Sequence, residues 1–262
     1  MEQRLWENDM FDAATEGATL AISMRREPVN AINEEWIDRL GQILDRYETR
    51  EEIRVLRFRS KLKAFCAGAD IDMLAERLST PGGVDQMIQT VRRMQALYAR
   101  IEQSALVSIA EINGVALGGG FELALACDIR VASDAAKVGL PEARHGLLPG
   151  AGGSQRLTKL FGAALSRRLI LGTEVVDGAE AARLGLVHWV FPADQLATKT
   201  DEIVRRLETV PKGAIQANKR CIFAAQERHG DGFELEVQMT KLLYENPESL
   251  NRLHAFLARR KR

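Results

Sequence analysis

The chain has 262 residues, of which 46% are hydrophobic, and it carries 36 basic and 36 acidic side chains. This length and apolar content suffice for a large buried core, and the balanced charge argues against nucleic acid or a membrane surface as a partner. The first residues contain no apolar signal-peptide run, and no apolar span is long enough to cross a bilayer. We therefore expect a soluble, cytoplasmic protein. The three distant cysteines and four scattered histidines predict neither a disulfide framework nor a metal site.

Strands and helices are predicted to alternate through the first half of the chain. Residues 18–23 and 55–60 are typical of strands, and Asn33 between them is a plausible N-cap of a helix. Residues 84–101 have the apolar spacing of a long amphipathic helix. Residues 106–110 are short, largely apolar and partly β-branched, which indicates a buried strand. This alternation predicts an α/β layered fold.

The second half of the chain ends in a helical region. Residues 129–132 and 186–190 are typical of strands, and Asp177 to Gly185 of a capped helix that a glycine ends. Beyond Pro192 the pattern is helical and contains no further strand. Its apolar stripes cover residues 196–207, 214–225, 233–244 and 250–257. We therefore expect two parts, a core of residues 1–195 and a helical region of residues 196–262.

A glycine-rich stretch lies at the centre of the chain. The buried strand is followed by Asn113-Gly114, then by Gly118-Gly119-Gly120, and then by an Ala- and Leu-rich segment that favours helix. A helix N-terminus presents free N–H groups and a partial positive charge. The stretch lacks the spacing of a dinucleotide-binding fingerprint. The remaining chemical use of its N–H groups is to stabilise a developing oxyanion, and tight packing alone is the alternative.

Two carboxylates stand among apolar or small residues. Glu122 falls in the first turn of the predicted buried helix, where a carboxylate is costly unless it is paired or hydrogen-bonded. Glu142 directly follows Pro141. Two carboxylates that share a pocket can provide one acid and one base at neutral pH. A solvated or helix-capping role fits the spacing equally well. His145, three residues after Glu142, is another candidate for the same pocket, although ordinary packing is favoured.

Seven stretches in this order resemble the enoyl-CoA hydratase/isomerase (crotonase) family. They are Asn30-Ala31-Ile32-Asn33, residues 65–71, residues 113–124, Pro141-Glu142, residues 149–157, Gly185-Leu186-Val187 and Ala255-Phe256-Leu257. The resemblance implies a core of stacked ββα turns that form a spiral. It also implies that the C-terminal helical part mediates homotrimers, often paired into homohexamers, and that the partner molecules are acyl-CoA thioesters.

The resemblance also assigns site residues. The backbone N–H groups of Ala69 and Gly119 would form the oxyanion hole for the thioester carbonyl. The residues that would contact the CoA part of the substrate are Ala67, Gly68, Asp70, Ile71 and Gly118, with Phe256 and Arg259 possible contacts from a neighbouring subunit. Coenzyme A is part of the substrate, and no metal or redox cofactor is implied.

Family members that keep both acidic residues are the hydratases. The resemblance therefore implies syn addition of water to a trans-2-enoyl-CoA, giving a 3-hydroxyacyl-CoA. Glu122 would help to activate the water as a base, and Glu142 would handle the proton at the α carbon as an acid. Double-bond isomerisation, dehydration and thioester hydrolysis remain alternatives within the family. A non-catalytic, RNA-linked binding protein is a further alternative, which the absence of a basic stripe disfavours.

Overall fold

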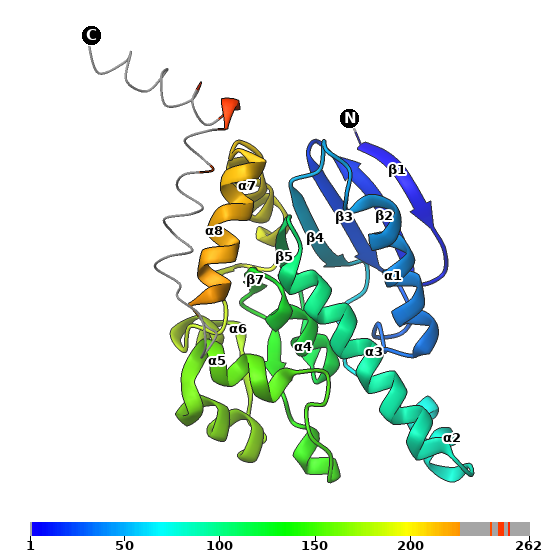
Figure 1. The fold of residues 1–262 in the computed structure, drawn as a ribbon. Coiled ribbons are helices and arrows are strands. Elements are labelled where there is room, and N and C mark those ends of the chain that lie inside the picture. Colours follow the sequence, from blue (N-terminus) through cyan, green and yellow to red (C-terminus); the bar gives the residue numbers. More distant parts are fainter. Residues whose placement is uncertain (1, 226–241, 243–245, 249–250, 252–262) are drawn as a thin grey trace.

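The computed structural model describes residues 2–225, 242, 246–248 and 251 (Figure 1). Two of the predicted C-terminal helices, at 233–244 and 250–257, therefore lie almost wholly outside the described residues. Phe256 and Arg259 also lie outside them.

The described part of the chain is organised around a seven-stranded sheet in the order β1-β2-β3-β4-β5-β7-β10. Its first three strands are antiparallel, and the pairs from β3 to β10 are parallel. The strands are β1 (Glu2–Glu7), β2 (Phe11–Glu16), β3 (Thr19–Met24), β4 (Val55–Ser60), β5 (Val107–Ile112), β7 (Ile129–Ser133) and β10 (Trp189–Phe191). A second, three-stranded sheet contains β6 (Val115–Leu117), β8 (Lys137–Gly139) and β9 (Val175–Asp177).

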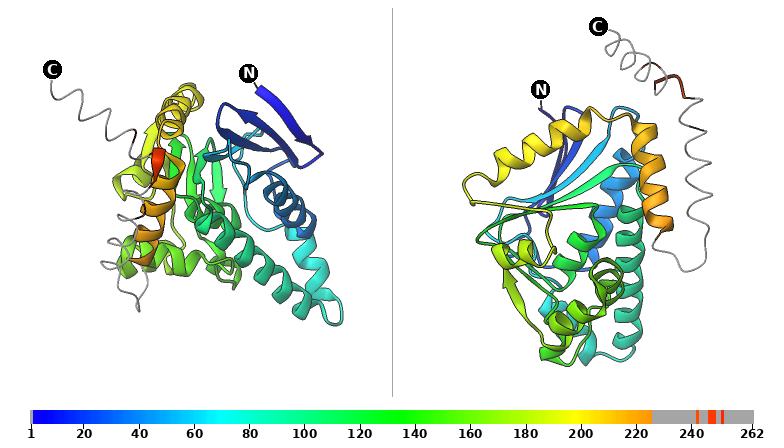
Figure 2. Two further views of the ribbon diagram at one scale, coloured as in Figure 1. Left: turned by 45° about the horizontal axis from the view of Figure 1, so that its top comes forward. Right: turned by 90° about the vertical axis from the view of Figure 1, so that its left-hand side faces the viewer.

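Helices cover both faces of the larger sheet (Figure 2). One face packs with α1 (Glu34–Tyr47), α3 (Gly83–Gln103) and α4 (Gly119–Ala126) in the main core. Side chains alternate along a strand, so the neighbours of those core residues face the other way. Val55, Ile109 and Val131 accordingly pack with α7 (Leu196–Glu208) in a separate cluster. The site described below lies on the α3 and α4 side.

The remaining helices surround the smaller sheet and the edges of the core. They are α2 (Ile71–Ser79), α5 (Gly153–Ser166), α6 (Gly178–Arg183) and α8 (Lys212–Ala224), with the short turns η1 (Glu142–His145) and η2 (Arg167–Leu171). Figure 1 shows α2 and the first half of α3 projecting together from the body. None of the helices within the described residues is both long and apolar enough to span a membrane.

The mixed α/β architecture predicted from the sequence is confirmed. Asn33 caps α1 by accepting the N–H of Trp36 at 2.8 Å, and Asp177 caps α6 by accepting that of Glu180 at 2.9 Å. The last strand begins at Trp189 and not at residue 186, because Leu186 closes the turn after α6 through its bond to the carbonyl of Ala181. The division at residue 195 stays a prediction, although α7 packs directly against the sheet.

Candidate active site

The helix that carries Glu122 enters the core through glycines. All eight residues of α4 are buried. A Cβ at Gly120 would lie 2.0 Å from the carbonyl oxygen of Cys66, so only glycine allows this close approach. Gly118 has a φ of +52°, and its N–H donates to Gly139 at 3.1 Å. The glycines thus bring the start of α4 against the segment that follows Cys66.

Two backbone N–H groups meet where this segment contacts α4. Ala69 forms a parallel β-bridge with Ile32. In this bridge the Ile32 N–H donates to the carbonyl of Gly68, and the Ile32 carbonyl accepts the N–H of Asp70. The Ala69 N–H is left out of the bridge, and the Gly119 N–H is one of the first donors of α4. Neither N–H has a hydrogen-bond acceptor among the residues that the structure describes. A Cβ at Gly68 would lie 3.4 Å from the Gly119 nitrogen, which shows that the two loops touch.

Glu122 is almost completely buried behind these loops, with 2% of its surface exposed. Its Oε1 accepts the N–H of Gly153 at 2.7 Å. Burial raises the pKa of Glu122 to about 7, and the nearby charge of Glu142 acts in the same direction. The N–H groups of Gly153 and Ala151 and the charge of Arg156 oppose this rise in pKa. The carboxyl group is therefore poised between its two protonation states at neutral pH.

Glu142 faces the same glycine loop from η1. Its Oε1 lies 3.2 Å from the position that a Cβ on Gly118 would occupy. Its Oε2 is buried and has no hydrogen-bond partner among the described residues. Burial raises the pKa of Glu142 as well. The structure thus brings Glu142 next to the loop that bears the Gly119 N–H, close enough to Glu122 for its charge to raise the pKa of that carboxyl group.

The other sequence-predicted residues are placed around the segment that bears Ala69. The Ala67 N–H donates to the carbonyl of Val29 at 3.0 Å. Asp70 caps α2 by accepting the N–H of Met73 at 3.1 Å. Ile71, the first residue of α2, is 76% exposed and so remains open to a ligand. His145 is exposed on η1.

The sequence analysis missed basic residues beside this segment, among them Arg25 and Arg26. Arg26 donates to Asp70 at 2.5 Å and to the carbonyl of Ala31 at 2.7 Å. A cavity of about 720 Å³ lies next to it, lined by Arg25, Arg26, Lys61, Leu62, Glu7, Asp9 and Glu27. The available signal was the Arg25-Arg26 pair, which three residues separate from the Asn-Ala-Ile-Asn stretch.

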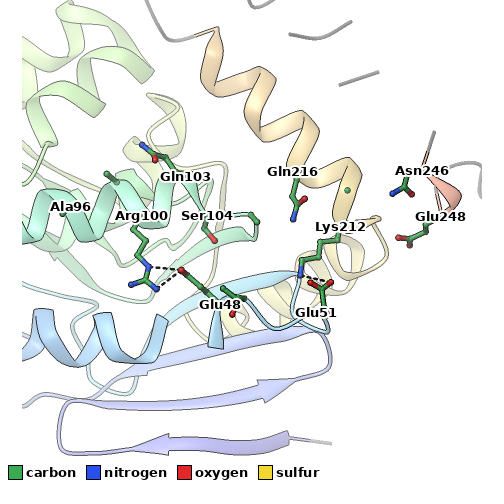
Figure 3. Close-up of a pocket in the computed structure, with 14 residues that line it drawn as sticks. Glu48, Glu51, Ala96, Arg100, Gln103, Ser104, Lys212, Gln216, Asn246 and Glu248 are labelled. Atoms are coloured by element: carbon green, nitrogen blue, oxygen red, sulfur yellow. Dashed lines mark hydrogen bonds and ion pairs between the residues drawn. The ribbon is translucent and has the colours of Figure 1, made fainter. Parts of the chain in front are cut away.

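A second cavity, of about 910 Å³, lies away from the carboxylates at the C-terminal end of α3 (Figure 3). Its charges pair with one another, Arg100 with Glu48 at 2.7 Å and Lys212 with Glu51 at 3.5 Å. Neither Glu122 nor Glu142 lines it. Within the described residues there is also no cluster of three His, Cys, Asp or Glu side chains that could hold a metal ion.

A mixed α/β fold that brings a buried and a half-buried carboxylate beside two N–H groups without acceptors among the described residues has the parts of an enzyme that stabilises an oxyanion. The family model described as enoyl-CoA hydratase/isomerase matches residues 14–262. The chain belongs to the enoyl-CoA hydratase/isomerase family.

Individual relatives agree with this assignment. Human enoyl-CoA hydratase domain-containing protein 2, mitochondrial, is 41% identical over 203 residues, which are 76% of this chain and 68% of that protein. Rat methylglutaconyl-CoA hydratase, mitochondrial, is 38% identical over 167 residues, 63% of this chain and 51% of that protein. The crystal structure of an enoyl-CoA hydratase from Geobacillus kaustophilus HTA426 superposes with a TM-score of 0.92 at 28% identity, covering 99% of this chain and 97% of that one. The family resemblance and the fold class expected from the sequence are confirmed.

Proposed function

We propose that this protein hydrates a trans-2-enoyl-CoA by syn addition of water, giving a 3-hydroxyacyl-CoA. The observation that carries the proposal is the placement of Glu122 and Glu142 near each other beside one glycine loop, next to the N–H groups of Ala69 and Gly119, which have no acceptor among the described residues. Hydration needs one group that takes a proton from water and one that gives a proton to carbon. It also needs donors for the charge that develops on the thioester oxygen.

In the proposed reaction the thioester oxygen accepts hydrogen bonds from the N–H groups of Ala69 and Gly119. These hydrogen bonds make the double bond electrophilic at C3. Ionised Glu122 takes a proton from water as the water oxygen bonds to C3. Protonated Glu142 gives its proton to C2, and the negative charge on the thioester oxygen collapses. A proton returned from Glu122 to Glu142, directly or through solvent, restores the starting state. The pKa of about 7 at Glu122 suits a base that is partly ionised at neutral pH, and burial shifts the pKa of Glu142 upward, in the direction that favours an acid.

For the CoA part of the substrate we propose the segment of Ala67, Gly68, Asp70 and Ile71, together with Gly118. The exposed Ile71 and the cavity lined by Arg25, Arg26 and Lys61 support this placement, because CoA carries several phosphate charges. Those cations are now shared with Asp12 and Asp70, so phosphate binding would compete with existing ion pairs.

The proposal is tested by incubating the protein with crotonyl-CoA and following the loss of the conjugated-thioester absorbance. Turnover that yields 3-hydroxybutyryl-CoA is the expected result. No loss of absorbance at high enzyme concentration would exclude simple hydratase activity. Release of free CoA or movement of the double bond would instead indicate a hydrolase or an isomerase.

A hydratase of a branched, carboxylated enoyl-CoA is the second candidate. The similarity to rat methylglutaconyl-CoA hydratase favours it, as do the basic side chains of Arg144 and His145, two and three residues after Glu142. Comparison of kcat/KM for crotonyl-CoA and 3-methylglutaconyl-CoA separates the two. A large preference for the carboxylated substrate would replace the first assignment.

We also propose a cytoplasmic homotrimer or homohexamer that uses no metal or redox cofactor. The family membership supports the oligomer, and the acid–base pair supports chemistry without a cofactor. Light scattering coupled to size-exclusion chromatography tests the oligomeric state. Full activity after dialysis against a chelator is the expected result if the reaction uses no metal ion.

A further inference from the structure

One face of α3 supports the site from behind. Gln95, Tyr98 and Glu102 are three and four residues apart, so they lie along the same side of the helix. Gln95 donates to the carbonyl of Gly150 at 2.7 Å, and the buried Tyr98 hydroxyl donates to that of Gly119 at 2.9 Å. Glu102 accepts two hydrogen bonds from Arg156, at 3.0 and 3.1 Å. Both loops that border Glu122 are therefore tied to α3.

The turn of residues 151–153, which contacts Glu122, packs around the side chain of Arg156 on α5. Arg156 is 8% exposed, and its Nη1 donates to the carbonyl of Ala151 at 3.0 Å. Its own N–H donates to the carbonyl of Gly152 at 2.9 Å. A Cβ at Gly152 would lie 2.4 Å from Nη1, and Gly152 has a φ of +102°, so the turn fits closely around the guanidinium group. The next residue, Gly153, gives its N–H to Glu122.

We propose that Arg156, oriented by Glu102, is a positioning residue that fixes the turn of residues 151–153 and thereby aims the Gly153 N–H at the Glu122 carboxylate. Arg156 touches no reacting atom in this scheme and acts through the turn. The kinetic consequence rests on the proposed function, whereas the structural consequence for Glu122 does not.

The arrangement also has an electrostatic consequence. The charged groups that shift the pKa of Glu122 are Glu142 on η1 and Arg156 on α5, and Glu122 in turn raises the pKa of the Tyr98 hydroxyl on α3. The positive charge of Arg156 lowers the pKa of Glu122, and Glu102 partly neutralises that charge. Removing the charge of Arg156 should therefore raise the pKa of Glu122. Removing the charge of Glu102 should lower it.

These opposite signs separate an effect on Glu122 that acts through Arg156 from mere stabilisation of the fold. The variants are Arg156→Gln and the isosteric Glu102→Gln, which can still accept a hydrogen bond from Arg156. The matched controls are Arg100→Gln and Glu48→Gln, which break an ion pair between Arg100 on the same helix and Glu48 at the C-terminal end of α1, in the lining of the other cavity (Figure 3). The readout is the carboxyl carbon resonance of Glu122 in the protein labelled with ¹³C-glutamate, identified by its absence in Glu122→Gln.

The expected result is an upward shift of the Glu122 titration midpoint in Arg156→Gln and a downward shift in Glu102→Gln, each of about half a pH unit or more. The controls should leave the midpoint in place. Shifts of the same sign in both variants, or no shift in the folded Glu102→Gln protein, would overturn the proposal.

A kinetic arm uses the pH dependence of kcat with crotonyl-CoA. The limb of the kcat–pH profile that reports Glu122 should shift in the same direction as the Glu122 titration midpoint in each variant. Arg156→Lys should have a higher kcat than Arg156→Gln, because it keeps the positive charge. If the protein does not hydrate crotonyl-CoA but the resonance shifts as expected, the proposed function fails and the positioning role stands. If the protein hydrates crotonyl-CoA but the Glu122 midpoint shifts in the same direction in Arg156→Gln and Glu102→Gln, the positioning role fails and the proposed function stands.

Discussion

Two glutamates buried in neighbouring elements have opposite surroundings. Glu111, on β5, is 6% exposed and accepts hydrogen bonds from two nitrogens of the buried Arg57, one of them at 2.8 Å. Arg57 also donates to Asp201 of α7 at 2.6 Å, so the pair joins the sheet to that helix. Glu122, on α4, is 2% exposed and accepts the backbone N–H of Gly153, with no cation in direct contact among the described residues.

The difference shows that burial of a carboxylate does not by itself mark a catalytic group. A buried charge is tolerated when a guanidinium neutralises it, and Glu111 then serves the fold. Glu122 keeps a raised pKa, a like-charged neighbour in Glu142 and a glycine loop in front of it, which is an arrangement suited to moving a proton. The predictions below test this contrast, from the largest expected effect to the smallest.

Replacing either site carboxylate should abolish hydration. Glu122→Gln and Glu142→Gln each remove one proton-transfer group, so kcat for crotonyl-CoA should fall by about 10²–10⁴-fold. Binding of an unreactive acyl-CoA, measured by calorimetry, should persist. A variant with near-wild-type kcat would remove that residue from the mechanism.

Replacing Arg57, the cation that neutralises Glu111, should lower the free energy of unfolding without changing kcat. Arg57→Met leaves Glu111 buried without its partner, which should lower the free energy of unfolding in urea by about 3–5 kcal/mol. The value of kcat per folded molecule should stay within about a factor of two, since Arg57 lies on the sheet face covered by α7. Arg183→Met, which removes an exposed ion pair with Glu180, is the control and should change stability by less than about 1 kcal/mol. A selective loss of kcat in Arg57→Met would contradict the contrast.

Adding one methyl group beside Glu122 should misplace its carboxylate. A Cβ at Gly153 would lie 2.8 Å from Oε1 and 2.9 Å from Cγ of Glu122. Gly153→Ala should therefore lower kcat by roughly 100-fold, the scale of a misplacement of about 1 Å. Gly41→Ala is the matched control, because nothing lies within 4 Å of its added Cβ. Unchanged kinetics in Gly153→Ala would show that the orientation of Glu122 is not critical.

The pKa of Glu122 should make the wild-type protein less stable as pH rises. Its ordinary pKa of 4.5 is raised to about 7 in the folded protein, so between these values the folded state binds more protons than the unfolded state. Stability should therefore fall across that window and level off above it. Glu122→Gln lacks this proton, so its stability relative to wild type should increase from pH 5 to pH 8 by on the order of 2 kcal/mol. Urea unfolding at both pH values measures this, and a pH-independent difference would contradict the raised pKa.

Local sequence signals predicted much of the fold. The caps at Asn33 and Asp177 and the apolar stripe of α3 were visible in short windows, because capping and periodicity are local. Strand β2 was missed, since its Asp, Ala and Glu residues have low strand propensity and pairing between β1 and β3 holds it in the sheet.

The two site carboxylates were predicted as candidates because buried acids stand out in apolar segments. Their supporting residues were not predictable in the same way. Glu102 and Arg156 are 54 residues apart, and Glu122 and Gly153 are 31 apart. No spacing rule joins such positions, so only the folded chain reveals that Arg156 belongs to the surroundings of Glu122.

The most direct test is to run the reaction with crotonyl-CoA in D₂O and to analyse the product by NMR and mass spectrometry. The account predicts 3-hydroxybutyryl-CoA with one deuterium at C2, added on the same face as the hydroxyl, and none of this product from Glu142→Gln beyond a trace. Recovery of unchanged crotonyl-CoA from the wild-type protein, or cleavage to free CoA, would contradict it.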